Sequence, residues 1–208
     1  MSNRFWGEES FISKNRLESL VDSVFAFAMT LLVISLAIPQ IPKPEAAAEL
    51  PPYIAGMVPE FTSFIIAFLL LAVFWTVHHR NFHFLHTIDS RVLWLNIFIL
   101  ICIVLVPFTT SVSGDYPDVL VAVILFHTNL LAIGLLFAAH WYYITHAPRL
   151  VEPPIDEKIV RCGSKKSFIT PVIATIAIIL SFFSSSNSMF TYLLIPPAIW
   201  FVQRFQCR

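Results

Sequence analysis

Apolar residues dominate six stretches of the chain, and short polar segments rich in proline or charge separate them. Each stretch is nearly free of charge, and most approach the roughly 20 residues that a helix needs to cross a bilayer. The pattern therefore predicts six transmembrane helices and no internal repeat. We expect these helices at residues 17–38, 53–83, 91–113, 118–146, 168–184 and 189–204.

Prolines and capping residues set the expected boundaries. Pro39 ends the first helix, and the linker at residues 41–52 is expected to be stiff. Pro59 would either kink the second helix or mark its true start, because proline lacks the backbone N–H. Asp89 suits the N-cap of the third helix, and Pro148 ends the fourth. We expect a short cytoplasmic lead-in at residues 1–15 and one transmembrane domain at residues 16–208.

Composition supports an integral membrane protein. Hydrophobic residues make up 57% of the chain and charged residues 12%, whereas a soluble domain carries about 25% charged residues. The fold class expected is therefore an all-α integral membrane protein whose surroundings are the lipid bilayer, and nucleic-acid binding has no support. Three widely spaced cysteines form no metal-type pair and are expected to be reduced: Cys102, Cys162 and Cys207.

The distribution of charge orients the predicted helices. With six crossings, all thirteen Lys and Arg residues except Lys43 fall on one side of the membrane. Because basic residues favour the cytoplasmic side, both termini are expected to be cytoplasmic. The other side carries acidic residues, namely Glu45, Glu49, Glu60, Asp115 and Asp118. An acidic outer side would concentrate cations. The same excess of acidic residues also arises simply because the basic residues are on the inner side.

The first helix carries a carboxylate, Asp22, beside a long apolar run. A charge in this setting needs a partner, because an unpaired charge in a bilayer is costly. Arg16 is six residues away and does not face Asp22 on one helix, so each is expected to pair with another helix. Basic side chains expected at the same depth are His78, His79, Arg80 and Arg91. Such a network could hold a moving helix or be purely structural.

One face of the same helix carries large apolar side chains at helical spacing: Phe27, Leu31, Ile34 and Ile38. Two hydroxyl residues, Ser23 and Thr30, lie beside that face and could contact a partly dehydrated ion. Such a face could form the hydrophobic constriction of a pore. Spacing alone favours ordinary packing in a helix that is apolar all round.

A histidine group follows the second apolar stretch, with the spacing HHxxxHxxH: His78, His79, His83 and His86. Imidazole suits zinc and iron, so a metal-dependent membrane enzyme is one alternative. No second histidine box accompanies the group, and the chain has no P-loop, GxGxxG or GxSxG motif. An enzyme is therefore not expected, and no cofactor is predicted.

Three segments together resemble the endolysosomal transmembrane potassium channel family, in its single-repeat prokaryotic branch. The segments are RLESLVDSVFAFAMTLLVISLAIP, FLLLAVFWTVHHRNF and DSRVLWLNIFILICIVLVPFTTSVSGDY. The resemblance implies a multi-pass cell-membrane channel that prefers potassium and leaks without voltage gating. It also implies a homotetramer in which the first helix of each subunit lines the pore, and a hydrophobic constriction replaces a carbonyl filter.

The resemblance carries over to particular residues. Of the family's Arg-x-x-x-Phe-Ser-Asp signature, Arg16 and Asp22 match, whereas Leu20 and Val21 replace Phe and Ser. The implied constriction is formed by Phe27, Leu31 and Ile34, with Thr30 at the hydroxyl position; Phe27 departs from the family's aliphatic residue. The implied network at the helix ends comprises Arg16, Asp22, Trp75, His78, Arg80 and Trp94. A proton-coupled carrier that uses Asp22 is the remaining alternative.

Overall fold

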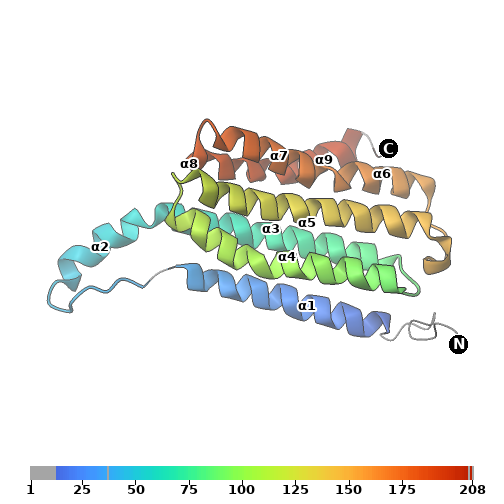
Figure 1. Cartoon of the computed structure of the whole chain (residues 1–208), viewed down its shortest axis with the longest axis horizontal. Coiled ribbons are helices and arrows are strands. Elements are labelled where there is room, and N and C mark those ends of the chain that lie inside the picture. The colour runs from blue at the N-terminus through green and yellow to red at the C-terminus, as the bar shows by residue number, and fades with distance from the viewer. Residues whose placement is uncertain (1–12, 37, 206, 208) are drawn as a thin grey trace, which may run out of the picture.

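The long helices lie side by side along a common axis, with α1 at one side of the bundle and α6, α7 and α9 at the other (Figure 1). This computed structural model describes residues 13–36, 38–205 and 207, so most of the expected lead-in at 1–15 lies outside the described residues. The long helices are α1 (Lys14–Leu31), α3 (Val58–His83), α4 (Ser90–Asp115), α5 (Leu120–His146), α6 (Glu157–Ser167) and α7 (Ile169–Ser181).

Five segments are long and apolar enough to cross a membrane: Lys14–Ile34, Val58–His83, Ser90–Asp115, Leu120–His146 and Glu157–Ser181. The last of these joins α6 and α7 into one span, although the sequence analysis expected α6 to be part of a polar loop. No strand occurs among the described residues. The all-helical membrane fold is therefore confirmed in its coarse form.

The sixth predicted helix, at residues 189–204, is divided in the structure. A short helix α8 (Ser185–Ser188) leads into the 3-10 helix η3 (Met189–Leu194) and then into α9 (Ile195–Phe205). Pro196 and Pro197 fall in the first turn of α9, where a missing N–H costs little. α9 runs back to the end of the bundle where α1 begins (Figure 1). The sixth crossing and the cytoplasmic position of both termini stay predictions.

Two expected boundaries on the other end of the bundle were wrong. The expected linker contains a helix, α2 (Ala46–Gly56), which includes Pro51 and Pro52 and buries no residue. α3 then starts at Val58 with Pro59 in its first turn, so Pro59 marks the helix start and does not kink it. The first helix is shorter than predicted, because α1 ends at Leu31 and continues as the 3-10 helix η1 (Leu32–Ser35).

The N-cap at Asp89 is confirmed and also ties two helices together. Asp89 Oδ1 accepts a hydrogen bond from the Val92 N–H at 2.9 Å. Its other oxygen accepts hydrogen bonds from Tyr143 on α5 and from Arg149 in η2 (Pro148–Leu150). Partial burial raises the pKa of Asp89, but these hydrogen bonds outweigh it and hold the pKa below its usual value. The connection between α3 and α4, residues 84–89, is thus fixed to the end of α5.

Helix α1 buries one face against α3 and α4. The buried side chains recur at spacings of three or four residues: Leu17, Val21, Phe25, Ala28 and Leu32. Helix α5 lies in the middle of the bundle and packs against α4, α6 and α7. The approach of α5 to α7 is so close that a Cβ on Gly134 would lie 2.8 Å from Cδ of Pro171.

The expectation of three reduced cysteines was wrong. Cys162 in α6 and Cys207 form a disulfide, with their Cα atoms 5.2 Å apart, and Cys102 is the remaining free, half-buried cysteine. The two bonded cysteines are 45 residues apart in sequence. Spacing alone could not reveal the pair, because it depends on α9 folding back along α6.

Candidate functional site

The face of α1 that points away from the bundle carries large, exposed apolar side chains beside polar ones. Phe27 is 63% exposed and Ile34 is 73% exposed, and Leu20 is also exposed. Leu20 and Phe27 are seven positions apart on α1, so they are rotated by only about 20° around the helix axis. Ile34 lies seven positions further along, in the 3-10 helix η1 that continues α1, and all three side chains are exposed. Leu31 is half-buried at the edge of this set. We call Leu20, Phe27 and Ile34 the α1 stripe.

The two hydroxyl residues beside the α1 stripe are exposed and bonded to their own helix. Ser23 Oγ donates to the Ser19 carbonyl at 2.7 Å, and Thr30 Oγ1 donates to the Phe27 carbonyl at 2.8 Å. A hydroxyl has one donor and two acceptor lone pairs. With the proton engaged by the helix, the oxygen atoms of Ser23 and Thr30 keep their acceptor sites for an outside partner such as a cation.

Asp22 has a neutral partner in the single chain. Its Oδ1 accepts a hydrogen bond from Trp75 Nε1 at 2.8 Å, and the Trp75 ring stacks on His79 with 6.0 Å between centroids. The bond joins α1 to α3 near the end where α1 begins. Arg16 is exposed, and the salt bridges found among the described residues join Arg149 to Asp89 and Arg161 to Glu157.

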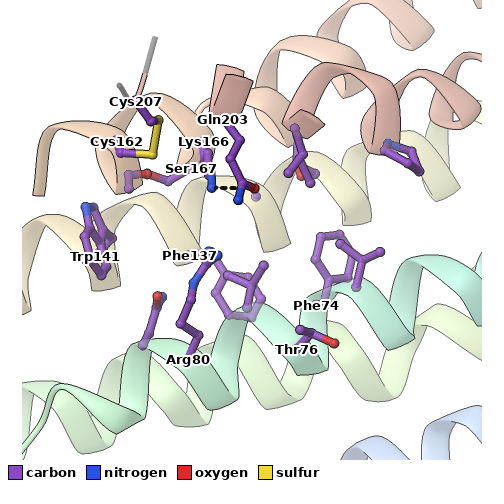
Figure 2. Close-up of a pocket in the computed structure, with 18 of the residues that line it drawn as sticks. Phe74, Thr76, Arg80, Phe137, Trp141, Cys162, Lys166, Ser167, Gln203 and Cys207 are labelled. Atoms are coloured by element: carbon purple, nitrogen blue, oxygen red, sulfur yellow. Dashed lines mark hydrogen bonds between the residues drawn. A yellow bond between two sulfur atoms is a disulfide. The ribbon is translucent and has the colours of Figure 1, made fainter. Parts of the chain in front are cut away.

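Arg80 lies away from Asp22 because of helix geometry. It follows Trp75 by five residues, which places it about 140° around α3. Its side chain points toward α6 and α9, where Figure 2 shows it facing Lys166 and Gln203. The sequence placed Arg80 at the correct depth but could not fix the direction in which it points.

His78 is buried between α3 and α4. Its Nε2 donates to Asn96 Oδ1 at 2.5 Å, and the Asn96 amide donates to the Val92 carbonyl. The His78 ring also stacks on Phe82 with 4.3 Å between centroids. Asn96 was not among the residues predicted for the site. The available signal was a single amide within an apolar run, because such a side chain in a membrane helix usually has an interhelical partner.

The four histidines proposed as metal ligands do not converge. His79 stacks on Trp75, and His83 lies beside the Phe84 ring. The backbone N–H of His86 donates to the Leu150 carbonyl. No group of three His, Cys, Asp or Glu side chains that could hold a metal occurs within the described part of the chain. The arrangement thus gives the metal-enzyme alternative no support.

Two further buried histidines on α5, taken from the sequence as isolated single residues, have separate surroundings. His127 on α5 is hydrogen bonded through one ring nitrogen to Tyr192 and through the other to Ser188. His140, also on α5, is buried and has no hydrogen-bond partner among the described residues. The His127 hydrogen bonds join α5 to η3 and α8, whereas His140 contacts the rings of His78 and Phe82 on α3.

The remaining expected site residues divide between surface and core. Trp94 is exposed, and its ring lies 6.3 Å from that of Phe98, between centroids, on the same helix. Of the two departures from the family signature, Leu20 extends the α1 stripe, whereas Val21 is 1% exposed and packs in the core. The position where the family has a serine hydroxyl is therefore an apolar contact in this chain.

Five helical segments suited to a bilayer define a multi-pass membrane protein. A model of the family described as endosomal/lysosomal potassium channel TMEM175 matches residues 16–107. A potassium channel of Chamaesiphon minutus is 30% identical over 172 residues, which cover 81% of this chain and 84% of the relative. The chain belongs to the TMEM175 family.

Further relatives agree with this assignment. A potassium channel of Streptomyces collinus is 27% identical over 150 residues, covering 70% of this chain and 71% of the relative. The crystal structure of the TMEM175 homologue from Chamaesiphon minutus, titled a lysosomal potassium-selective channel homologue, superposes with a TM-score of 0.77 at 28% identity. It covers 92% of this chain and 97% of the homologue. The mouse endosomal/lysosomal proton channel TMEM175 is 26% identical, but this chain matches only 36% of its length.

Proposed function

We propose that this protein is a potassium channel of the cell membrane, built as a homotetramer with α1 of each subunit lining the pore. Membership in the TMEM175 family and the names of its bacterial relatives support the activity. The observation that carries the pore assignment is the α1 stripe, a line of large apolar residues exposed on a helix whose other face is buried.

Several copies are required because one subunit presents one such face. α1 lies at the side of the bundle (Figure 1) and cannot enclose a pathway by itself. When copies are arranged around an axis, Phe27 and Ile34 would meet their equivalents and form the narrow, dry constriction, with Leu31 at its edge. A hydrophobic constriction controls ion passage by dewetting. The acceptor oxygens of Thr30 and Ser23 would then contact the ion between the apolar rings.

Each subunit is proposed to cross the membrane six times, with both ends in the cytoplasm. The first turn of α1 and the last turn of α9 lie at the same end of the bundle (Figure 1). η3 and α9 would together extend about 28 Å if collinear, at 2.0 Å and 1.5 Å per residue. This length approaches the roughly 30 Å hydrocarbon core, so the divided segment is long enough for the sixth crossing.

The Asp22–Trp75 hydrogen bond is proposed to fix the cytoplasmic end of the pore helix. This bond links α1 to α3 through the indole N–H of Trp75 and one carboxylate oxygen of Asp22. A carboxylate at the pore entrance would also favour cations over anions. His78 contributes indirectly, because its bond to Asn96 holds α3 against α4. Arg16, Arg80 and Trp94 have no direct contact with this bond and are proposed only as nearby charges and surface anchors.

Potassium flux into liposomes tests the assignment. Ile34→Asn places an amide in the dry constriction and should raise leak or change selectivity between potassium and sodium. Ile179→Asn is the matched control, since Ile179 is an exposed isoleucine on α7, at the other side of the bundle. If both variants behave like the wild type, the pore assignment is wrong.

The number of subunits separates the channel from the carrier alternative. Chemical crosslinking in detergent should yield a tetramer, and a planar bilayer should show unitary current steps. A monomer or dimer with saturable, pH-dependent transport that is lost in Asp22→Asn would instead favour the proton-coupled carrier.

A further inference from the structure

A large groove opens between α3 and the pair α6 and α9, with α5 behind it (Figure 2). It encloses about 930 Å³. It lies on the part of α3 that faces away from α1, so the groove and the α1 stripe are separate surfaces. A cavity of this size is large enough for a substantial organic ligand.

One end of the groove is basic. Arg80 from α3 and Lys158 and Lys166 from α6 line it, and none of its described lining residues is acidic. Figure 2 shows Arg80 and Lys166 pointing into the same space from opposite walls. The Lys166 Nζ donates to Gln203 Oε1 at 3.3 Å, a neutral partner. None of the three cations takes part in a salt bridge among the described residues. Cations gathered without a counter-charge favour a bound anion.

The other end of the groove is apolar. Its walls there include Leu69 and Val73 on α3, and Pro196 and Ile199 on α9. From Arg80 back to Leu69 is eleven residues, which corresponds to about 16 Å along the helix. Half of a bilayer's hydrocarbon core is roughly 15 Å thick. The distance from the basic end to the apolar end therefore matches the depth of one leaflet.

We propose that this groove binds an anionic diacyl phospholipid, with its phosphate at Arg80, Lys158 and Lys166 and an acyl chain along Leu69, Val73 and Ile199. The charge selects a headgroup with a net negative charge, and the apolar length selects a molecule that also carries a chain. Free phosphate shares only the first property. A second copy of the subunit would need an acidic surface to match the three cations.

Lipid titration of the purified full-length protein in neutral detergent tests the proposal. Phosphatidylglycerol should raise the midpoint of thermal unfolding more than phosphatidylcholine at the same concentration. Inorganic phosphate at the same concentration should give little stabilisation, because it cannot fill the apolar part. Equal stabilisation by both lipids, or by phosphate alone, would overturn the assignment to an anionic lipid.

Charge variants locate the binding site. Lys166→Gln and Lys158→Gln should each weaken phosphatidylglycerol binding about fivefold, as expected for one basic residue at an anionic surface. Lys165→Gln is the matched control, because Lys165 is exposed on the same helix and does not line the groove. If Lys165→Gln weakens binding as much as Lys166→Gln, general surface charge is responsible and the groove is not the site.

An apolar variant separates the chain from the headgroup. Leu69 is exposed at the apolar end, so Leu69→Trp should occupy the groove and weaken lipid binding while the protein still folds. A Leu69→Cys variant tests the competing occupant. Crosslinking of Leu69→Cys between two subunits would place a second copy in the groove and exclude the lipid. Because neither readout involves ion flux, failure here would leave the proposed channel activity untouched.

Discussion

The α1 stripe and the groove of α3, α6 and α9 are both apolar surfaces left open by a single chain, and they differ in charge. The stripe itself is apolar and is accompanied by the hydroxyls of Ser23 and Thr30, with one exposed basic side chain, Arg16, at the end where α1 begins. The groove has three basic side chains at one end. They lie on different sides of the bundle, since α1 and the pair α6 and α9 are separated by α3, α4 and α5 (Figure 1).

This difference indicates which ligand each surface can accept. A potassium ion would be repelled by Arg80, Lys158 and Lys166, so the groove is unsuited to conduct cations. The α1 stripe offers acceptor oxygens and no positive charge along its length, which suits a partly dehydrated cation. An anionic lipid headgroup is attracted by the three cations of the groove, whereas the acceptor oxygens beside the α1 stripe do not favour it. Hydrophobicity alone therefore does not distinguish a pore face from a lipid face, whereas the polar atoms beside it do.

The largest effect is expected from Gly134→Ala, in the wall of the groove. The added Cβ would lie 2.8 Å from the rigid Pro171 ring, forcing α5 and α7 apart at a cost of about 1–3 kcal/mol. We expect Tm to fall by several degrees, measured by thermal unfolding in detergent. Gly56→Ala is the control, because nothing lies within 4 Å of its added Cβ. Equal Tm values for the two variants would show that α5 and α7 do not need their close approach.

The second effect concerns the α1 stripe. Phe27→Ala should widen the constriction and raise potassium flux roughly tenfold, equivalent to ~1.4 kcal/mol of the barrier. Lipid binding to the groove should not change. Phe182→Ala provides the comparison, since Phe182 is similarly exposed but lies at the end of α7. An unchanged flux in Phe27→Ala, or an equal increase in Phe182→Ala, would remove Phe27 from the pore.

The periodicity of apolar residues was sufficient to predict the long helices and the Asp89 cap. It failed in two other places. Prolines at 51 and 52 suggested a stiff linker, yet they lie inside α2, a helix that buries no residue, so tertiary packing does not account for this difference. The Cys162–Cys207 bond depends on the path of α9, which no local pattern contains.

For the candidate site, the depth of the side chains along the helices could be predicted from the sequence, but the direction in which they point could not. Asp22, Trp75 and Arg80 were expected at one level, but helical rotation sends Trp75 toward α1 and Arg80 toward α6. The buried partner Asn96 was overlooked although a single amide in an apolar run was a usable signal. Spacing defined the face of Phe27 and Ile34, and only packing of Val21 and Phe25 into the core shows which side of α1 is left open.

A smaller effect is expected at the junction of α1 and α3. Trp75→Phe removes the indole donor to Asp22 and should cost about 1 kcal/mol, the usual net value of one hydrogen bond. A double-mutant cycle with Asp22→Asn should give a coupling energy of similar size, measured by unfolding. The same cycle between Asp22→Asn and Arg80→Gln should give almost none. A stronger coupling to Arg80 would mean that the expected ionic network forms and that α3 is rotated relative to this structure.

The smallest effect is expected at Asp89, whose paired charge contrasts with the unpaired cations of the groove. Because the pKa of Asp89 is lowered in the folded protein, its stabilising contribution is complete above the ordinary carboxyl pKa of about 3.9 and disappears as the pH falls through the lowered value. Asp89→Asn keeps an N-cap side chain but loses the charge beside Arg149. At pH 7 it should cost roughly 0.2–1 kcal/mol.

The difference in Tm between the wild type and Asp89→Asn should stay constant from pH 7 to pH 5 and shrink only in more acidic buffer. Glu157→Gln is the reference variant, because Glu157 pairs with Arg161 in a bridge whose two side chains are both largely exposed, so its loss should be almost undetectable. If the Asp89→Asn difference instead grew as the pH fell, the carboxylate would be destabilising in the folded state.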